Sequence, residues 1–219
     1  TPIGANVRST VATYADIHDE LRRAFARTSE AKAAGYKAGA FSYNTGALRC
    51  PTCDGTGSIS LDVQFLPDVE IVCPACRGSR YADAASLIHR EGKDGSLLTL
   101  PQLMDMSVDE AIDATLGLKK VQTRLQTLHD LGLGYLTLGE PTPALSGGEA
   151  QRLKLASEMG RVQDDAVFVF DEPTIGLHPL DVQVLLSVFD GLVSKGATVI
   201  VIEHDLDLIR NADYVIDMG

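Results

Sequence analysis

The spacing of apolar side chains predicts one helix near the start of the chain, followed by a region of strands and turns over residues 41–80. Ile17, Leu21 and Phe25 recur three or four residues apart, which places them on one face of a helix. We expect this helix to cover residues 13–34. Two more helices are expected in the middle of the chain, over residues 107–116 and 121–131.

In the last third, continuous apolar runs alternate with helical patterns. We expect helices at residues 147–159, 181–195 and 206–212, and strands at residues 166–170, 197–202 and 214–218. Uninterrupted apolar strands that alternate with helices are typical of a parallel sheet covered on both faces. The sequence therefore predicts an α/β fold for this part, with a strand–helix–strand crossover.

All four cysteines form two Cys-x-x-Cys pairs in one short region. The stretch between the pairs alternates apolar and polar side chains up to Pro67, which predicts a β-hairpin with its turn there. Each pair sits on a tight turn that aims two thiolates at one point. A tetrahedral sulfur shell for structural Zn²⁺ would then comprise Cys50, Cys53, Cys73 and Cys76. Two disulfides or four buried thiols are the alternatives.

The glycine-rich stretch Leu145-Ser-Gly-Gly-Glu-Ala-Gln151 is the most specific pattern in the chain. Ser146 can cap the following helix while Glu149 closes a capping box. Gly147 and Gly148 leave the first turn without side chains, so free N–H groups and the positive end of the helix dipole can receive an anion. A nucleotide triphosphate suits this position, although an ordinary capped helix has the same local pattern.

Charged side chains follow two of the predicted strands. Asp171 and Glu172 come directly after the run that ends at Phe170, and His204 follows the next apolar run. Ligands of open α/β sheets bind beyond the carboxyl ends of the strands. Asp171 there suits Mg²⁺ binding, and Glu172 suits a general base. Taken separately, the acids are compatible with a solvated turn and the histidine with a structural role.

Composition restricts the classes of function. The net charge of −11 argues against a protein that coats nucleic acid by general electrostatic attraction. Residues 22–93 contain 10 basic and 7 acidic side chains, whereas residues 131–219 contain 5 and 14, so a polyanion contact is expected in the front half. No apolar run has the length of a membrane span, and no secretory leader is visible. We expect a cytoplasmic protein without membrane contacts.

The glycine-rich stretch, the two acids and the histidine together resemble the signature motif, Walker B motif and switch histidine of ABC ATPases, in that family's order and spacing. Gly176-Leu-His-Pro-Leu-Asp181 is similar to the D-loop of the same proteins. The resemblance implies binding of ATP and Mg²⁺. It implies nucleotide and metal contacts from Ser146, Gly147, Gly148, Glu149, Gln151 and Asp171, and catalytic roles for Glu172 and His204.

The four-cysteine insertion before the signature motif resembles one ABC family in particular, the UvrA proteins of bacterial nucleotide-excision repair. Stretches such as Phe41-Ser-Tyr-Asn44, Phe65-Leu-Pro-Asp-Val69 and Gly132-Leu-Gly-Tyr135 carry this resemblance, which covers essentially the whole chain. It implies an ATP-dependent subunit that recognises lesions in double-stranded DNA and contains a second ABC module. A homodimer, a UvrB-type helicase partner and a place in the SOS response are also implied.

The same resemblance divides the chain into three parts. We expect residues 1–12 to be a linker from an upstream ATPase lobe, residues 13–144 a signature or insertion domain with the zinc module at about 41–81, and residues 145–219 an ABC ATPase lobe. The fold class expected is therefore an α/β, ABC-type P-loop NTPase fragment with an inserted α-helical and zinc-hairpin domain.

Two departures from the UvrA pattern leave alternatives open. Phe41–Cys50 offers only Arg49 where the family is more basic, which suggests a UvrA-like paralogue in drug resistance or regulation. No Gly-x-x-x-x-Gly-Lys-Ser/Thr P-loop (Walker A) occurs in the chain, so we expect this fragment to be inactive alone. A structural zinc module with a vestigial ATPase is the third alternative, and the intact Glu172 and His204 count against it.

Overall fold

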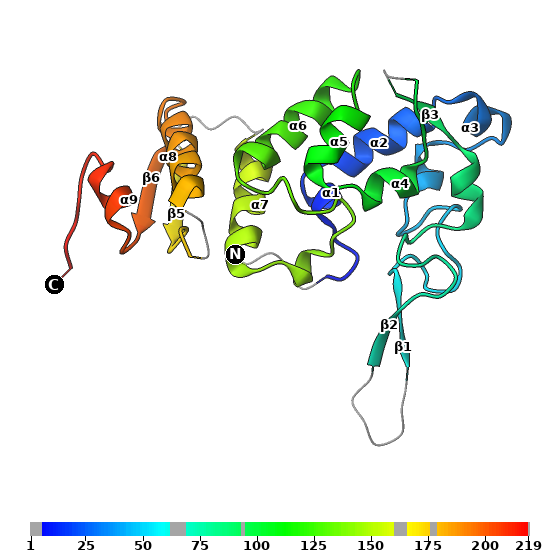
Figure 1. Cartoon of the computed structure of the whole chain (residues 1–219), viewed down its shortest axis with the longest axis horizontal. Helices are drawn as coiled ribbons and strands as arrows, with labels where there is room; N and C mark the ends of the chain where they lie inside the picture. Colours follow the sequence, from blue (N-terminus) through cyan, green and yellow to red (C-terminus); the bar gives the residue numbers. More distant parts are fainter. Residues whose placement is uncertain (1–5, 62–68, 93–94, 160–165, 176–178, 219) are drawn as a thin grey trace.

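The computed structural model describes residues 6–61, 69–92, 95–159, 166–175 and 179–218. A helical body lies in the middle, a hairpin projects from it, and a small α/β unit lies at one end (Figure 1). The helical body and hairpin contain α1 (Val11–Tyr14), α2 (Ile17–Phe25), α3 (Ser29–Ala33), η1 (Ala38–Phe41), β1 (Ser58–Leu61), β2 (Val69–Val72), η2 (Asp83–Leu87), β3 (Arg90–Glu91), β4 (Leu97–Leu98), α4 (Leu100–Asp105), α5 (Val108–Ala114), α6 (Lys119–Asp130), η3 (Thr142–Ala144) and α7 (Gly147–Met159). The α/β unit contains β5 (Val167–Asp171), α8 (Pro179–Val193), β6 (Thr198–Ile202) and α9 (Leu206–Arg210).

The single helix predicted over residues 13–34 is wrong, because three short helices occupy this region. Asp16 separates α1 from α2 with a left-handed backbone, φ 56°. Thr28 separates α2 from α3: its hydroxyl donates to the Phe25 carbonyl at 2.9 Å and accepts from the Ala31 N–H at 3.3 Å. A side chain that closes one helix and caps the next competes with a continuous helix. The apolar side chains of α2 still share one buried face, although the helix is interrupted at Asp16 and Thr28.

The core of the helical body forms where α6 packs against α2 and α5. Ile17, Leu21 and Phe25 of α2 are fully buried, and they share one cluster with Leu125 and Leu128 of α6. The α2 side chains are the three whose spacing predicted the buried face. Burial of one large apolar side chain stabilises the fold by about 1.5–3 kcal/mol, so this shared face holds the short helices together.

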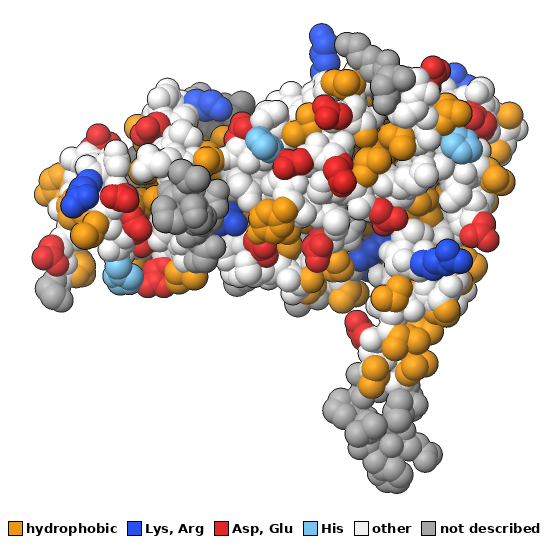
Figure 2. All heavy atoms as spheres, viewed as in Figure 1, with side chains coloured by type: hydrophobic (Ala, Val, Ile, Leu, Met, Phe, Trp, Pro, Cys, Tyr) orange, Lys and Arg blue, Asp and Glu red, His pale blue; other side chains and the backbone are white. Residues whose placement is uncertain are grey.

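The predicted β-hairpin is present as the antiparallel pair β1 and β2. Ile59 lies opposite Ile71 and Leu61 opposite Val69, which places all four side chains on one face of the ribbon. Leu61, Val69 and Ile71 are 42%, 45% and 38% exposed. Apolar side chains therefore gather along the projecting arm (Figure 2). The turn predicted at Pro67 lies outside the described residues.

Strands β5 and β6 pair in parallel, which confirms the predicted sheet. The register places Val167 opposite Thr198 and Asp171 opposite Ile202. The crossover between the strands runs through α8 and packs against one face of the sheet. On that face the ring of Phe170 in β5 lies 4.8 Å from a phenylalanine ring of α8.

The expectation that this sheet is covered on both faces is wrong for the described residues. Alternate side chains of β5 and β6 point away from α8, and there Val167, Val169 and Ile200 are 62%, 61% and 48% exposed. Phe170, on the α8 side, is only 6% exposed. Continuous apolar composition predicted both faces correctly as apolar, but within the described residues only one face has a packing partner.

The strand predicted at residues 214–218 is also wrong. The chain after α9 has no regular structure, and Tyr214, Ile216 and Met218 are 83%, 73% and 90% exposed. A strand needs a neighbour for its backbone N–H and C=O groups. Among the strands that the structure describes, none pairs with this segment. Apolar composition therefore does not suffice to make a strand here.

The domain boundaries at residues 12 and 144 stay predictions. The backbone N–H groups of Val11 and Ala12 donate to the carbonyls of Glu140 and Leu138 at 3.0 and 2.9 Å. These bonds join the start of the described chain to the loop that precedes α7. Among the helices in the described ranges, none combines the length and apolar character that a bilayer crossing requires.

Candidate functional site

The four predicted cysteine ligands come together at the base of the hairpin. All four are buried free thiols, and their Sγ atoms lie within 4.8 Å of one another. The Sγ atoms of Cys50 and Cys73 are 3.9 Å apart, and those of Cys53 and Cys76 are 3.6 Å apart. A tetrahedral zinc centre with Zn–S bonds of about 2.3 Å has sulfur–sulfur edges of about 3.8 Å, whereas a disulfide bond is about 2.05 Å long. The spacing fits zinc and excludes disulfides.

Backbone groups of the first knuckle approach the sulfur atoms closely. The Gly57 N–H donates to the Cys53 Sγ at 3.3 Å. Gly55 has φ 78°, and a Cβ there would lie 1.7 Å from the Tyr43 carbonyl oxygen. Burial opposes ionisation of Cys53, but hydrogen bonds from Gly57 and the neighbouring thiols outweigh it and lower its pKa to about 7. Burial raises the pKa of Cys76 to about 12. Cys53 therefore ionises more readily than Cys76. Several thiolates in one cluster need a bound cation to offset their charge.

Two arginines fasten the first knuckle to the preceding chain. Arg8 donates to the backbone carbonyl and to the carboxylate of Asp54, at 2.7 and 3.1 Å. Arg80, which is 4% exposed, donates to the carbonyls of Val7 and Gly55 at 3.1 and 3.4 Å. Buried guanidinium groups that join backbone carbonyls fix the relative placement of the segments they bridge. The knuckle is therefore tied to residues 7–8 from both sides.

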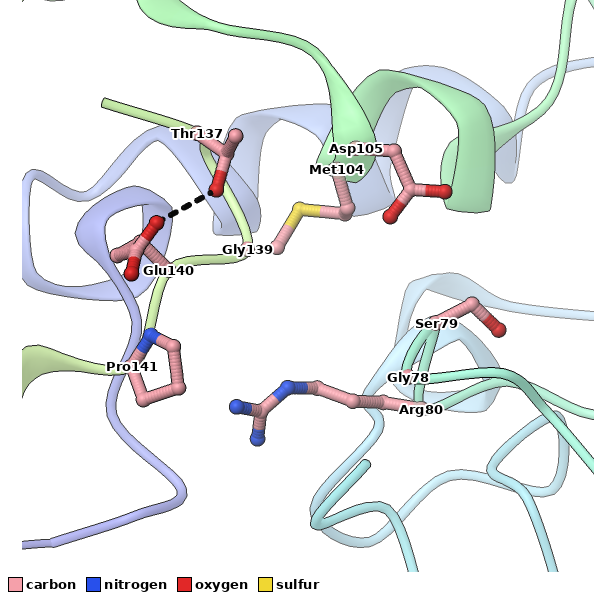
Figure 3. A pocket seen from close by; sticks show the side chains of 9 residues that line it. All are labelled: Gly78, Ser79, Arg80, Met104, Asp105, Thr137, Gly139, Glu140 and Pro141. Carbon is pink, nitrogen blue, oxygen red and sulfur yellow. Dashed lines mark hydrogen bonds between the residues drawn. The ribbon is translucent and has the colours of Figure 1, made fainter. Parts of the chain in front are cut away.

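A small pocket lies between the second knuckle and the loop before α7. The side chain of Arg80 extends across it toward Pro141, and the Thr137 hydroxyl donates to Glu140 at 3.1 Å (Figure 3). Burial raises the pKa of Asp105, which also lines the pocket. The volume of the pocket is about 170 Å³. None of the residues that line the pocket is one of the predicted nucleotide-site residues.

Helix α7 begins with the predicted capping box. The Glu149 N–H donates to the Ser146 hydroxyl at 3.3 Å, and the Ser146 N–H donates to the Glu149 carboxylate at 2.6 Å. The Tyr135 hydroxyl donates to the other oxygen of that carboxylate. Burial opposes ionisation of Glu149, but the hydrogen bonds from Tyr135 and Ser146 outweigh it and lower its pKa. Ser146 and Gly147 are exposed, so the helix N-terminus is open to a ligand.

The first turns of α7 lie beside the loop that follows β5. A Cβ added at Gly148 would lie 2.9 Å from the Ile175 carbonyl oxygen, whereas one added at Gly147 would meet nothing within 4 Å. The Gln151 side-chain amide donates to the Asp171 carbonyl at 3.4 Å. The structure therefore brings the start of α7 against the end of β5 and the loop that follows it.

Asp171, Glu172 and His204 gather at one end of the sheet, as predicted from the strand ends. The His204 Nε2 lies 2.7 Å from a carboxylate oxygen of Glu172. Their side chains are 80% and 39% exposed, so the pair is accessible from solvent. The Glu172 N–H donates to the Ile202 carbonyl at 2.8 Å and extends the β5–β6 ladder. The D-loop predicted at residues 176–181 lies outside the described residues, apart from the backbone of residues 179–181.

Comparisons with known proteins decide which family this arrangement matches. No family model matches the chain. The chain is 48% identical over 220 residues to UvrABC system protein A of Mycobacterium bovis and 46% identical over 219 residues to that of Bacillus subtilis, with 100% of this chain covered in both cases. The crystal structure of UvrA2 from Deinococcus radiodurans matches 97% of this chain at 42% identity with a TM-score of 0.87.

The chain is homologous to UvrA proteins throughout. The fold class predicted from the sequence is confirmed by the same comparison. The chain spans 22% of the length of the two UvrA relatives and 26% of the UvrA2 chain. The comparisons therefore cover only part of a whole UvrA protein, and this chain is UvrA-like over that part.

Two site residues of the UvrA-like chain were missed from the sequence, Glu203 and Thr174. The Glu203 carboxylate accepts the Thr174 N–H at 2.9 Å and the His204 N–H at 2.7 Å. The available signal was an acid directly before the histidine. Its partner could not be inferred, because Thr174 is 29 residues away and meets Glu203 only through the pairing of β5 with β6.

The UvrA-like chain carries residues that suit part of a nucleotide site. Asp171 offers carboxylate oxygens, which Mg²⁺ prefers, and Ser146 and Gly147 offer exposed groups at a helix N-terminus. The phosphate-cradling amides and lysine of a P-loop are not encoded in these residues. The residues present fit some of the contacts that a nucleotide and Mg²⁺ require.

Proposed function

We propose that this chain is the signature and zinc-hairpin segment of an ATP-dependent damage-recognition subunit of the bacterial nucleotide-excision repair excinuclease. The observation that carries the proposal is the 2.7 Å contact between Glu172 and His204 at the strand ends, beside the capped helix α7. The homology to UvrA proteins over 100% of the chain supports it. ATP turnover and DNA binding then belong to the longer protein of which this segment forms about a fifth.

Each residue at the strand ends has a distinct role in this proposal. Glu172 orients and deprotonates the attacking water, and His204 contacts the terminal phosphate and holds the Glu172 carboxylate. Asp171 holds Mg²⁺, which when bound neutralises charge on the phosphates. Ser146 and Gly148 place the N-terminus of α7 against a nucleotide held by the P-loop of the second ABC module. The isolated chain is inactive because it contains no P-loop.

The four cysteines hold one structural Zn²⁺ in this proposal. Four thiolates close the tetrahedral shell, so no position is left for a substrate or water. The site stabilises the base of the hairpin, and the hairpin contributes to contact with lesion-bearing double-stranded DNA. The proposed assembly is a cytoplasmic homodimer that loads a UvrB-type helicase subunit. Metal analysis of the purified protein should give about one zinc per cluster, and a folded metal-free protein contradicts the assignment.

The decisive test is Glu172→Gln in the full-length protein with its other ABC module silenced. Loss of a positioned general base lowers ATP turnover by about 10²–10⁴-fold. Asp213→Asn, which changes an exposed carboxylate after α9, should leave turnover unchanged. Unchanged turnover in Glu172→Gln removes Glu172 from catalysis. Equal affinity for intact and lesion-bearing duplexes contradicts the repair role.

A UvrA-like paralogue in drug resistance or regulation is the second candidate function. The observation that favours it concerns the contacts of Arg49, the one basic side chain within Phe41–Cys50. Its guanidinium contacts the Asn44 carbonyl at 3.2 Å and, at 2.9 Å, the Asp54 carboxylate that Arg8 also contacts, so its charge is partly offset. This segment therefore offers little free positive charge to a DNA backbone. A protein that hydrolyses ATP yet binds damaged and intact DNA equally favours this candidate.

A further inference from the structure

The carboxylate of Glu203 joins the two loops that follow adjacent strands. One oxygen accepts the Thr174 N–H at 2.9 Å and also the Thr174 hydroxyl. The other oxygen accepts the N–H groups of His204 and Asp205, at 2.7 and 3.1 Å. Thr174 follows β5, whereas His204 and Asp205 follow β6. A single side chain thus receives four hydrogen bonds from both sides of the proposed catalytic pair.

The loop after β5 needs such a restraint because its backbone is strained. Glu172 has φ 46°, in the left-handed region that residues other than glycine rarely adopt. Strain of this kind persists only where the surroundings fix it. The Ile175 N–H closes a turn onto the Glu172 carbonyl at 3.2 Å, and Thr174 within that turn is held by Glu203. Holding Thr174 therefore holds the conformation that directs Glu172 toward His204.

We propose that Glu203 is a positioning residue, which sets the 2.7 Å contact between Glu172 and His204 by clamping the loops that carry them. This inference rests on the proposed ATPase function and names a further residue of the same site. Glu203 does not touch the reacting atoms in this scheme and acts through its neighbours. It supplies the rigidity that catalytic groups need from the shell of residues behind them.

Only a carboxylate suits this position, because every group that faces it is a donor. The two oxygens of a carboxylate accept about four hydrogen bonds, whereas glutamine has one acceptor oxygen and an NH₂ donor. In Glu203→Gln the NH₂ group would face either Thr174 or the N–H groups of His204 and Asp205. Burial opposes ionisation of Glu203, but the hydrogen bonds from Thr174, Asp205 and His204 outweigh it and lower its pKa. The group is therefore ionised at neutral pH.

A graded series of variants in the full-length protein, with the other ABC module silenced, tests the clamp. Glu203→Gln should lower kcat for ATP at least about tenfold while KM changes by less than about twofold, because the catalytic pair and not nucleotide binding is disturbed. Thr174→Val removes one donor and should lower kcat by about three- to tenfold. Thr174→Ser keeps both donors and should restore kcat to within about twofold of the native value. Asp207→Asn, on the exposed side of α9, is the matched control.

Hydrogen–deuterium exchange on the same proteins separates the clamp from catalysis. Peptides that contain residues 172–175 and 203–205 should exchange faster in Glu203→Gln and Thr174→Val than in Thr174→Ser. Native kcat in Glu203→Gln or in Thr174→Val overturns the proposal, as does unchanged exchange of both peptides. Should Glu203→Gln fail to fold, Thr174→Val and Thr174→Ser still decide. If Glu172→Gln leaves turnover unchanged while the exchange differences are present, the proposed function fails and the clamp between the loops stands.

Discussion

Two adjacent glycines at the start of α7 have different reasons to lack a side chain. Gly147 faces open space, which suits an exposed helix N-terminus that receives a ligand. Gly148 faces the Ile175 carbonyl, 2.9 Å from where a Cβ would lie, so it permits α7 to approach the loop after β5. The local sequence marks both as small residues but does not reveal that only one is a packing requirement.

This difference gives a prediction at the residue scale. Gly148→Ala should lower the free energy of unfolding by about 1–3 kcal/mol, because the methyl group meets backbone that cannot rotate away. Gly147→Ala should be neutral or stabilising by up to about 1 kcal/mol, since alanine favours helix and the space is open. Denaturant unfolding followed by circular dichroism measures both. Equal stability of the two variants would contradict the close approach of α7 to Ile175.

Sequence reasoning succeeded for residues whose partners are close in the chain. The Cys-x-x-Cys turns and the pair of Ser146 and Glu149 were predictable because spacing alone sets their geometry. It failed for Glu203, whose partner Thr174 is supplied by strand pairing. Contacts that arise from register require the fold, and a single sequence without it shows only an acid beside a histidine.

At the scale of elements, apolar periodicity predicted which face is buried better than where each element ends. The stripe through α2 was predicted correctly, but the breaks at Asp16 and Thr28 were not. Those breaks depend on side-chain caps that compete with helix continuation. Residues 214–218 show the opposite failure, since an apolar run had no neighbouring strand to pair with.

A buried histidine joins α2 to residues 41 and 81, which flank the cysteine cluster in the sequence. The His18 Nε2 on α2 lies 2.7 Å from the Tyr81 hydroxyl, which itself donates to the Phe41 carbonyl at 3.0 Å. His18 must therefore donate through Nε2–H to the tyrosine oxygen. Burial, followed by the charge of Arg22, lowers the pKa of His18 to about 3.

The depressed pKa of His18 predicts a loss of stability in mild acid. The unfolded chain binds the proton near pH 6.5 while the folded chain stays neutral down to about pH 3. Stability from this group is thus complete above pH 6.5 and falls by about 1.4 kcal/mol per unit below it, until about pH 3. Between pH 7 and 5.5, urea unfolding should show native protein losing about 1 kcal/mol more than His18→Gln, which cannot titrate.

An exposed histidine provides the control for this experiment. His129 lies on the surface of α6, where its Nδ1 contacts the Asp109 carboxylate at 2.7 Å, so His129→Gln replaces a histidine without touching the core. His129→Gln should retain the extra acid sensitivity that His18→Gln loses. Parallel pH profiles for native protein and His18→Gln would rule out the buried neutral histidine.

At the scale of the whole molecule, the open face of the β5–β6 sheet is a large apolar surface. We expect the isolated chain to self-associate through it as concentration rises, because exposed apolar patches of packed sheets promote association. Val169→Thr combined with Ile200→Thr should reduce the association while changing the melting temperature less than a substitution on the covered face, since both side chains are at least about half exposed. Sedimentation velocity over a range of concentrations measures the effect.

The covered face of the same strand supplies a matched control. Val201 points toward the core, so Val201→Thr should lower stability without reducing association. An isolated chain that stays monomeric at every concentration would contradict the prediction. The sequence indicated two apolar faces for this sheet, but which face α8 covers depends on the packing of the whole α/β unit.

The attachment of the first knuckle has a mechanical consequence for the projecting arm. The cysteine cluster and the Arg8–Asp54 contact anchor the base of β1 and β2. The hairpin projects from this anchored base. Strand β1 has four residues, and at about 3.3 Å per residue it extends about 13 Å from the base of the hairpin. A rotation of about 10° at the root shifts the far end of β1 by about 2 Å. Any movement of the chain at Arg8 would therefore displace the far ends of β1 and β2, while the cysteine cluster restrains the base of the hairpin.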